Sequence, residues 1–97
     1  MKVIGVDIGG TKTAIGIIDD NNGKVYEKLI IPSKNFTDDK KSLHLIISNI
    51  LNLSDKNKIK HIGIGVPELI NIRGIIKGNY NFNWNNKNLV NYFPKNF

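Results

Sequence analysis

The segment from Asp7 to Lys12 brings together residue types that can bind a phosphate and its metal ion. Gly9 and Gly10 allow the backbone to turn sharply without side chains in the way, so its N–H groups can approach phosphate oxygens. Thr11 adds a hydroxyl donor, and Lys12 adds a positive charge. The carboxylate of Asp7 can hold a hydrated Mg²⁺, which keeps most of its water ligands in proteins. The segment is therefore suited to the phosphates of a nucleotide.

A β-hairpin without a ligand is the alternative interpretation of the same segment. Consecutive glycines supply the positive φ angles that hairpin turns often require. Against this interpretation stands Asp7, because an ionised carboxylate is costly inside an otherwise apolar strand unless it has a partner or a metal. The position of Asp7 favours phosphate binding, with the carboxylate on the metal side.

Three strands are predicted around this segment. Residues 3–8 form an apolar run with β-branched members, which indicates a strand buried on both faces. Residues 13–18 and 25–31 also have strand character, and residues 19–23, rich in Asp and Asn, separate them as a turn. Because the three consecutive strands are joined by short loops, we expect an antiparallel meander.

A helix and a fourth strand follow the meander. Thr37 can cap a helix that runs to Leu53, with Asp38 and Asp39 in its first turn. The apolar residues of this helix recur at three- and four-residue spacing and form one stripe: Leu43, Ile46, Ile47 and Ile50. Residues 59–66 indicate a further strand, which the crossover through the helix makes parallel to one of the first three.

Beyond Pro67 the sequence predicts a small hairpin, a loop rich in Asn and aromatic residues, and a short helix. These elements correspond to residues 69–72 with 75–77, to residues 79–86 and to residues 88–93. The whole order predicts a single α/β domain over residues 1–97, with a three-stranded antiparallel meander and one parallel strand in a mixed sheet.

Composition narrows the class of protein further. The 97-residue chain has a formal net charge of +6 and contains no cysteine, which excludes a disulfide framework and a thiolate metal site. Lys56, Lys58 and Lys60 form the densest basic patch, which we interpret as a solvated loop.

The sequence shows no signal for secretion or for membrane insertion. Asp7 interrupts the first apolar run before a signal-peptide core is complete, and no stretch reaches the roughly 18 apolar residues of a membrane span. We expect a cytoplasmic protein without a nucleic-acid or membrane partner.

The segment from Asp7 to Lys12 and three later features of the sequence all resemble parts of one protein family. Asp7–Lys12, followed by a second strand, resembles the first phosphate loop of the actin-like and hexokinase-like ATPase superfamily, in the form found in the ROK family of sugar kinases and repressors. Gly63–Pro67 is similar to the strand of that family that ends in Gly-Val-Pro. Asn81–Trp84 is similar to its Asn-x-x-Trp segment, and Leu89 to a Leu that usually follows. The four features occur in the family's order and span nearly the whole chain.

The resemblance implies a ribonuclease-H-like half-domain that holds MgATP, with a sugar bound in a cleft against a second domain. Asp7 would bind Mg²⁺ through water, and the residues along the β- and γ-phosphates would be Gly9, Gly10, Thr11 and Lys12. Residues 1–97 would then be the N-terminal ATPase-like domain of a longer kinase whose C-terminal domain is absent.

On the sugar side, the resemblance implies that Asn81 and the loop after Pro67 face the substrate. Taken alone, Asn81 also fits a local turn, and we interpret Trp84 as a packing anchor. Family members usually have Gly directly after the Pro, whereas this chain has Glu68. The side chain of Glu68 is expected either to crowd the sugar or to contact it.

No catalytic residue is assigned in this chain. The resemblance places the catalytic Asp of the family in an Asn-Asp pair beyond Phe97, together with the later sugar ligands, the zinc-binding segment and the adenine-binding half. We interpret His44 and His61 as structural or surface residues. Since phosphoryl transfer needs both substrates positioned and a group to accept the hydroxyl proton, we expect the chain by itself to be inactive.

Two other functions stay open beside an ATP-dependent hexose or glucose kinase. One is a non-catalytic sugar- or nucleotide-binding regulatory module of the same family, and the other is a structural domain that keeps only the fold. Repressors of the family carry a helix-turn-helix before the phosphate loop, and here the first strand begins at residue 3, which favours the kinase branch. Besides the sugar, the expected partner is a second copy, because the family commonly forms dimers.

Overall fold

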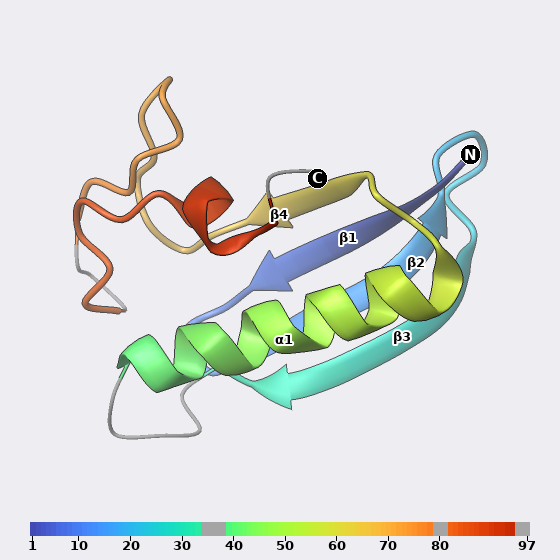
Figure 1. Ribbon diagram of the computed structural model, residues 1–97, viewed down its shortest axis with the longest axis horizontal. Coiled ribbons are helices and arrows are strands. Elements are labelled where there is room, and N and C mark those ends of the chain that lie inside the picture. Colours follow the sequence, from blue (N-terminus) through green and yellow to red (C-terminus); the bar gives the residue numbers. More distant parts are fainter. Residues whose placement is uncertain (34–38, 79–81, 95–97) are drawn as a thin grey trace.

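One mixed sheet and one long helix form the fold. The computed structural model describes residues 1–33, 39–78 and 82–94. Strands β1 (Lys2–Ile8), β2 (Lys12–Asp19) and β3 (Val25–Pro32) form an antiparallel meander, and helix α1 (Asp39–Asn57) leads to strand β4 (Ile62–Gly65). The strand order is β3-β2-β1-β4, with β4 parallel to β1 (Figure 1). The predicted fold class is confirmed.

The predicted boundaries differ from the observed ones around the helix. The proposed cap, Thr37 with Asp38, lies outside the described residues. At the other end the helix runs to Asn57, four residues beyond the predicted end at Leu53. Strand β4 is shorter than predicted because Ile59 completes the helix end and does not join the sheet: its N–H donates to the carbonyl of Ser54 at 3.0 Å.

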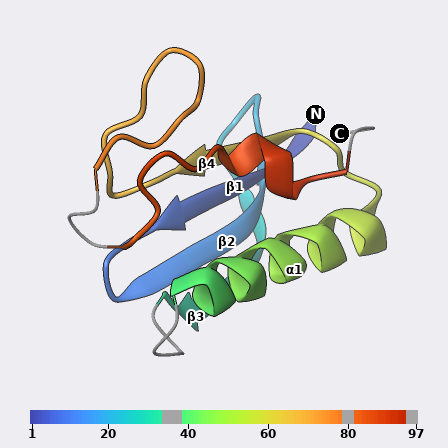
Figure 2. The same ribbon diagram turned by 60° about the vertical axis from the view of Figure 1, so that its left-hand side comes forward.

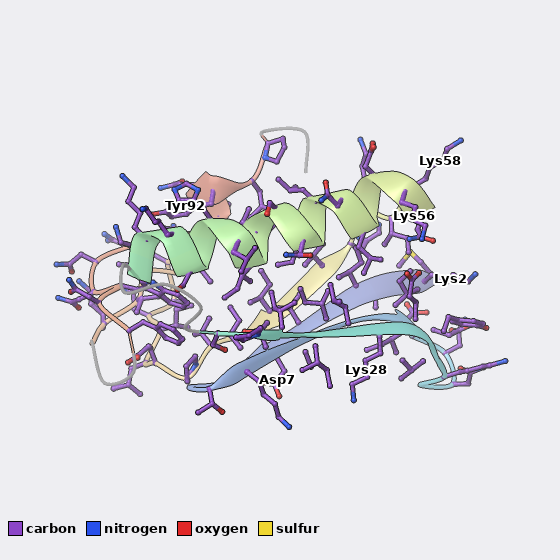
Figure 3. All side chains as sticks on the ribbon, turned by 90° about the horizontal axis from the view of Figure 1, so that it is seen from below. Lys2, Asp7, Lys28, Lys56, Lys58 and Tyr92 are labelled. Atoms are coloured by element: carbon purple, nitrogen blue, oxygen red, sulfur yellow. The ribbon has the colours of Figure 1, made fainter. Side chains whose placement is uncertain are left out.

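Helix α1 lies against one face of the sheet (Figure 2). On β1 the residues that face this helix are buried, while Asp7 on the opposite face is exposed. Figure 3 shows Asp7 and Lys28 on the side of the sheet away from α1. The prediction that β1 is buried on both faces is wrong, because in the described residues only one face of the sheet is covered by a helix. The desolvation argument for a partner of Asp7 therefore does not apply in this chain.

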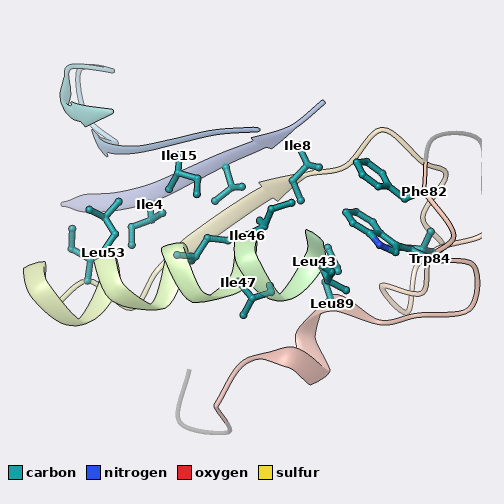
Figure 4. Close-up of a cluster of buried hydrophobic side chains, with 14 of the residues drawn as sticks. Ile4, Ile8, Ile15, Leu43, Ile46, Ile47, Leu53, Phe82, Trp84 and Leu89 are labelled. Atoms are coloured by element: carbon teal, nitrogen blue, oxygen red, sulfur yellow. The ribbon is translucent and has the colours of Figure 1, made fainter. Parts of the chain in front are cut away.

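The hydrophobic core lies between α1 and the sheet (Figure 4). The predicted apolar stripe of the helix is confirmed, since all of its members are buried: Leu43, Ile46, Ile47 and Ile50. The sheet contributes five buried residues from its two central strands: Ile4, Val6, Ile8, Ile15 and Ile17. Burial of this apolar surface is the main favourable term in folding.

The region after β4 is a tight hairpin followed by a short 3₁₀ helix, as predicted. Ile70 and Ile76 form an antiparallel bridge, and the turn between them contains Gly74 at a φ of 80°. The 3₁₀ helix η1 (Leu89–Tyr92) begins after Asn88, whose side chain accepts a hydrogen bond from the N–H of Val90 at 3.0 Å. None of the helices in the described part of the chain has the length and apolarity to span a membrane.

Replacing Lys58 with Gly is expected to stabilise the protein by about 0.5–1 kcal/mol. Lys58 has a φ of 55°. Its N–H and that of Ile59 donate to Asp55 and Ser54, which is the Schellman arrangement that usually has Gly at this position. A thermal melt should show the midpoint of Lys58→Gly raised by roughly 2–8 °C. The same change at Lys56, inside the helix, should lower the midpoint, and a lower midpoint for Lys58→Gly would contradict the prediction.

Candidate functional site

Asp7 lies at the carboxyl end of β1, where the parallel strand β4 also ends. In the sheet Asp7 is paired with Ala14 of β2 on one side and with Gly65 of β4 on the other. A Cβ added at Gly65 would lie 3.9 Å from the Oδ1 atom of Asp7. The space beside the carboxylate is therefore free of side chains from its two sheet neighbours, apart from the methyl group of Ala14.

The turn between β1 and β2 is held by a short backbone contact. The N–H of Gly9 donates to the carbonyl of Lys12 at 2.9 Å, and a Cβ at Gly9 would lie 2.8 Å from that carbonyl oxygen. The φ angle is positive at neither Gly9 nor Gly10. The glycine at position 9 is thus needed for a close approach of the backbone and not for a positive φ.

The remaining groups of this turn are open to solvent. Thr11 and Lys12 have exposed side chains. Among the described residues, no acceptor takes the N–H groups of Gly10 and Thr11. Two backbone donors, a hydroxyl and an amine are therefore available at the turn, whereas the N–H of Gly9 is used by the hairpin itself.

A buried pair of hydroxyls fixes the turn to the end of β3. The N–H of Ser33 donates to the carbonyl of Thr11 at 2.9 Å, and the hydroxyls of Thr13 and Ser33 are 2.7 Å apart. Both hydroxyl residues are completely buried. Sequence reasoning missed this pair because Thr13 and Ser33 meet only through the register of β2 with β3. These bonds hold the turn after β1 in one place relative to the sheet.

A groove of about 360 Å³ opens beside Asp7 on the uncovered face of the sheet. Its lining includes Asp7, Lys28 and glycines from three strands, Gly5, Gly16 and Gly63. No hydrogen bond or ion pair engages the carboxylate of Asp7 within the described residues. In that part of the chain no three His, Cys, Asp or Glu residues are grouped to hold a metal. One free carboxylate fits Mg²⁺ that keeps its waters, and not a cage made by protein ligands alone.

Glu68, one of the two predicted sugar-side residues, follows the end of β4 by three residues. The N–H of Phe82 donates to Oε1 of Glu68 at 3.1 Å. The rings of Phe82 and Trp84 are stacked, with centroids 4.0 Å apart and planes 6° from parallel. Trp84 is completely buried, so the interpretation as a packing anchor is confirmed. Asn81, the other predicted sugar residue, lies outside the described residues.

Other charged residues contribute to surface contacts. Lys56, Lys58 and Lys60 are exposed, and the ammonium of Lys56 is 3.7 Å from a carboxylate oxygen of Glu27. At the end of the sheet away from the turn, the Met1 ammonium donates to Asp20 at 2.9 Å, and this bond raises the pKa of the amine above its usual value. His61 is exposed, and the exposed His44 packs edge-on against Tyr92, with ring centroids 5.8 Å apart. These positions agree with the surface role assigned to the two histidines.

The fold and the turn define a class of protein. A three-stranded meander, a crossover helix and a parallel fourth strand, with a glycine turn where the first strand ends, are the architecture of a ribonuclease-H-like half-domain. The sequence model of the ROK family matches residues 3–97. The chain therefore belongs to the ROK family.

The relatives of this chain are longer proteins, and the chain spans less than a third of each of the three described below. The glucokinase of Thermotoga maritima is 31% identical over 97 residues, which are 98% of this chain and 30% of that protein. The crystal structure of a ROK family glucokinase from Streptomyces griseus, in complex with glucose and AMPPNP, aligns with a TM-score of 0.75 and 23% identity over 92% of this chain and 28% of that one. The ROK hexokinase from Thermus thermophilus aligns with a TM-score of 0.70 and 24% identity over 92% and 30%. These structural matches support the fold.

Proposed function

We propose that the chain is the N-terminal phosphate-binding part of an ATP-dependent sugar kinase, which transfers the γ-phosphoryl group of MgATP to a sugar hydroxyl. The observation that carries this proposal is the carboxylate of Asp7, two residues before a glycine turn, in a member of the ROK family. Neither this carboxylate nor the N–H groups of Gly10 and Thr11 have a partner in the part of the chain that the structure describes. The products would be ADP and a sugar phosphate. The sugar kinases and the AMPPNP complex among the relatives support the proposal.

Each group of the turn has one role in this proposal. Asp7 binds waters of Mg²⁺, and the metal supplies charge neutralisation for the phosphates when it is bound. The N–H groups of Gly10 and Thr11 donate to phosphate oxygens, and the hydroxyl of Thr11 adds a further donor. Lys12 contributes a positive charge beside the phosphates. Gly9 keeps the turn tight enough for these donors to lie together.

The sugar is proposed to lie beyond the end of β4. Asn81 is proposed to bind a sugar hydroxyl through its side-chain amide. Glu68 lies at the same end of the sheet as Asp7, because it follows β4 by three residues and β4 is parallel to β1. The phosphates and the sugar would thus meet at one edge of the sheet, in a cytoplasmic enzyme that we propose is a homodimer.

The chain alone is proposed to bind MgATP without turning it over. It supplies charge stabilisation on the phosphate side, but no base for the hydroxyl proton, and proton transfer to a positioned base contributes typically 10²–10⁴-fold to a rate. A coupled assay with ATP and glucose should therefore give no turnover above a blank. A rate like that of the full-length glucokinases would overturn this part of the proposal.

Isothermal titration calorimetry tests the phosphate site directly. The wild-type chain is expected to bind MgATP, and Asp7→Ala to bind it at least tenfold more weakly, since it loses charged hydrogen bonds to the water shell of the metal. Removing Mg²⁺ with EDTA should lower the affinity of the wild-type chain for ATP to that of Asp7→Ala. Asp55→Ala, which removes an exposed carboxylate on α1, is the matched control and should bind like wild type. Equal affinity for ATP with and without Mg²⁺, or no heat from any of these proteins, would favour the structural domain.

A further inference from the structure

Glu68 connects two segments that are distant in the sequence. It follows Pro67 at the end of β4, and its Oε1 atom accepts the hydrogen bond from the N–H of Phe82 at 3.1 Å, across 14 positions of the chain. The side chain of Glu68 is half-buried and that of Phe82 is 1% exposed. A hydrogen bond to an ionised carboxylate in such a place contributes more than one between neutral groups.

The N–H group that donates to Glu68 lies next to a stacked pair of aromatic rings. Phe82 is the residue of this segment whose backbone Glu68 contacts. On the other side, the ring of Phe82 is stacked on the completely buried Trp84. The carboxylate and the aromatic stack therefore restrain the segment at two successive points.

Glu68 is a departure from the sequence pattern of the ROK family described above. Family members usually have Gly after the Pro, and Gly has no side chain that could accept a hydrogen bond from the backbone N–H at the position of Phe82. In this chain Glu68, whose carboxylate accepts this hydrogen bond, is three residues after Gly65 in the sequence. Gly65 is the neighbour of Asp7 in the sheet. One short stretch of backbone thus links the phosphate end of the sheet to the segment that begins with Phe82.

We propose that Glu68 is a positioning residue that holds the Phe82–Trp84 segment to the end of β4, at the edge of the sheet where we propose that the sugar binds. The hydrogen bond to Phe82 stands on the geometry alone, whereas the consequence for the sugar rests on the proposed function. Glu68 acts through the backbone of Phe82 and not as a sugar ligand. An amide in its place keeps an oxygen that can accept the same bond, which makes Glu68→Gln the conservative variant.

Amide hydrogen exchange of the ¹⁵N-labelled full chain tests the hydrogen bond without any sugar. In Glu68→Ala the amide of Phe82 is expected to exchange at least tenfold faster than in wild type, while in Glu68→Gln it stays within about threefold. The amide of Ile76, which donates to the carbonyl of Lys87 at 2.8 Å, is the internal control and should not change. An unchanged rate at Phe82 would overturn the proposal, as would an equal increase at Phe82 and Ile76, which would report general loosening of the fold.

Trp84 provides the second readout, because it is the only tryptophan of the chain. Titration with glucose, followed by Trp84 fluorescence, is expected to give a dissociation constant at least fivefold higher for Glu68→Ala than for wild type, with Glu68→Gln close to wild type. Equal constants in all three proteins, despite lost protection at Phe82, would overturn the positioning role. If wild type itself does not respond to glucose while exchange at Phe82 depends on Glu68, the proposed sugar site and the positioning role fail, and only the hydrogen bond stands.

Discussion

Replacing Trp84 with Ala is expected to lower the free energy of unfolding by about 3–5 kcal/mol. The indole is completely buried, stacks on Phe82 and belongs to the same apolar cluster as Ile8 and Leu43. Removing it forfeits this burial and leaves a cavity beside Phe82 that the surrounding backbone fills only in part. Because small domains have a total stability of about 5–15 kcal/mol, a large part of this chain's stability depends on one side chain.

Urea unfolding followed by far-ultraviolet circular dichroism measures the loss, since the fluorescent residue is the one removed. Tyr26→Ala is the matched control: Tyr26 is 46% exposed on β3 and contacts the ammonium groups of Lys2 and Lys24 at 4.5 and 5.0 Å from its ring centre. Exposed contacts of this kind contribute about 0.5–1 kcal/mol each. If Trp84→Ala shifted the unfolding midpoint no further than Tyr26→Ala, the aromatic stack would not be the anchor of the segment after β4.

Replacing Gly9 with Ala is expected to weaken MgATP binding at least tenfold and to destabilise the fold by about 1–3 kcal/mol. The added Cβ would lie 2.8 Å from the carbonyl oxygen of Lys12, a backbone atom that cannot move without opening the hairpin. Opening the hairpin displaces the N–H groups of Gly10 and Thr11, which we propose bind the phosphates. Calorimetry with MgATP and a urea titration give the two numbers separately.

The chain contains a suitable control for this substitution. Gly63 lies in β4 of the same sheet, and a Cβ added there meets nothing within 4 Å. Gly63→Ala should therefore change stability by less than about 0.5 kcal/mol, so it is a control for the steric effect on the fold. If Gly9→Ala bound MgATP as tightly as wild type, the shape of the turn would not matter for binding, and the phosphate-binding proposal would lose its basis.

Several features could be predicted from the sequence because they depend on local patterns. The apolar runs with β-branched residues in the strands and the three- and four-residue spacing of the helix stripe indicate which segments become which element. The short loops between the first three strands leave only the meander, and the crossover helix requires the parallel fourth strand. Residues 7–12 stood out for the same reason, since a carboxylate and a glycine pair at the end of a strand are adjacent in the chain.

Other features depended on contacts between distant segments, so no local pattern could reveal them. Asp7 is exposed because only one face of the sheet is covered in the described residues, and strand residues alone do not say what packs on either face. Lys58 ends the helix in a conformation that usually selects Gly, so the position of that end was missed. The pairing of Thr13 with Ser33 required the register of two strands.

The chemical groups of the turn and the exact shape of the turn are therefore determined in different ways. The sequence alone determined the elements, their order and the chemical groups near Asp7, because these follow from residue types and spacings along the chain. Tertiary structure decided which groups are available. The N–H of Gly9 donates within the hairpin and that of Phe82 donates to Glu68, whereas those of Gly10 and Thr11 find no acceptor among the described residues. Hydrogen bonds are directional and short, so which donors meet which acceptors is settled only when the segments have packed.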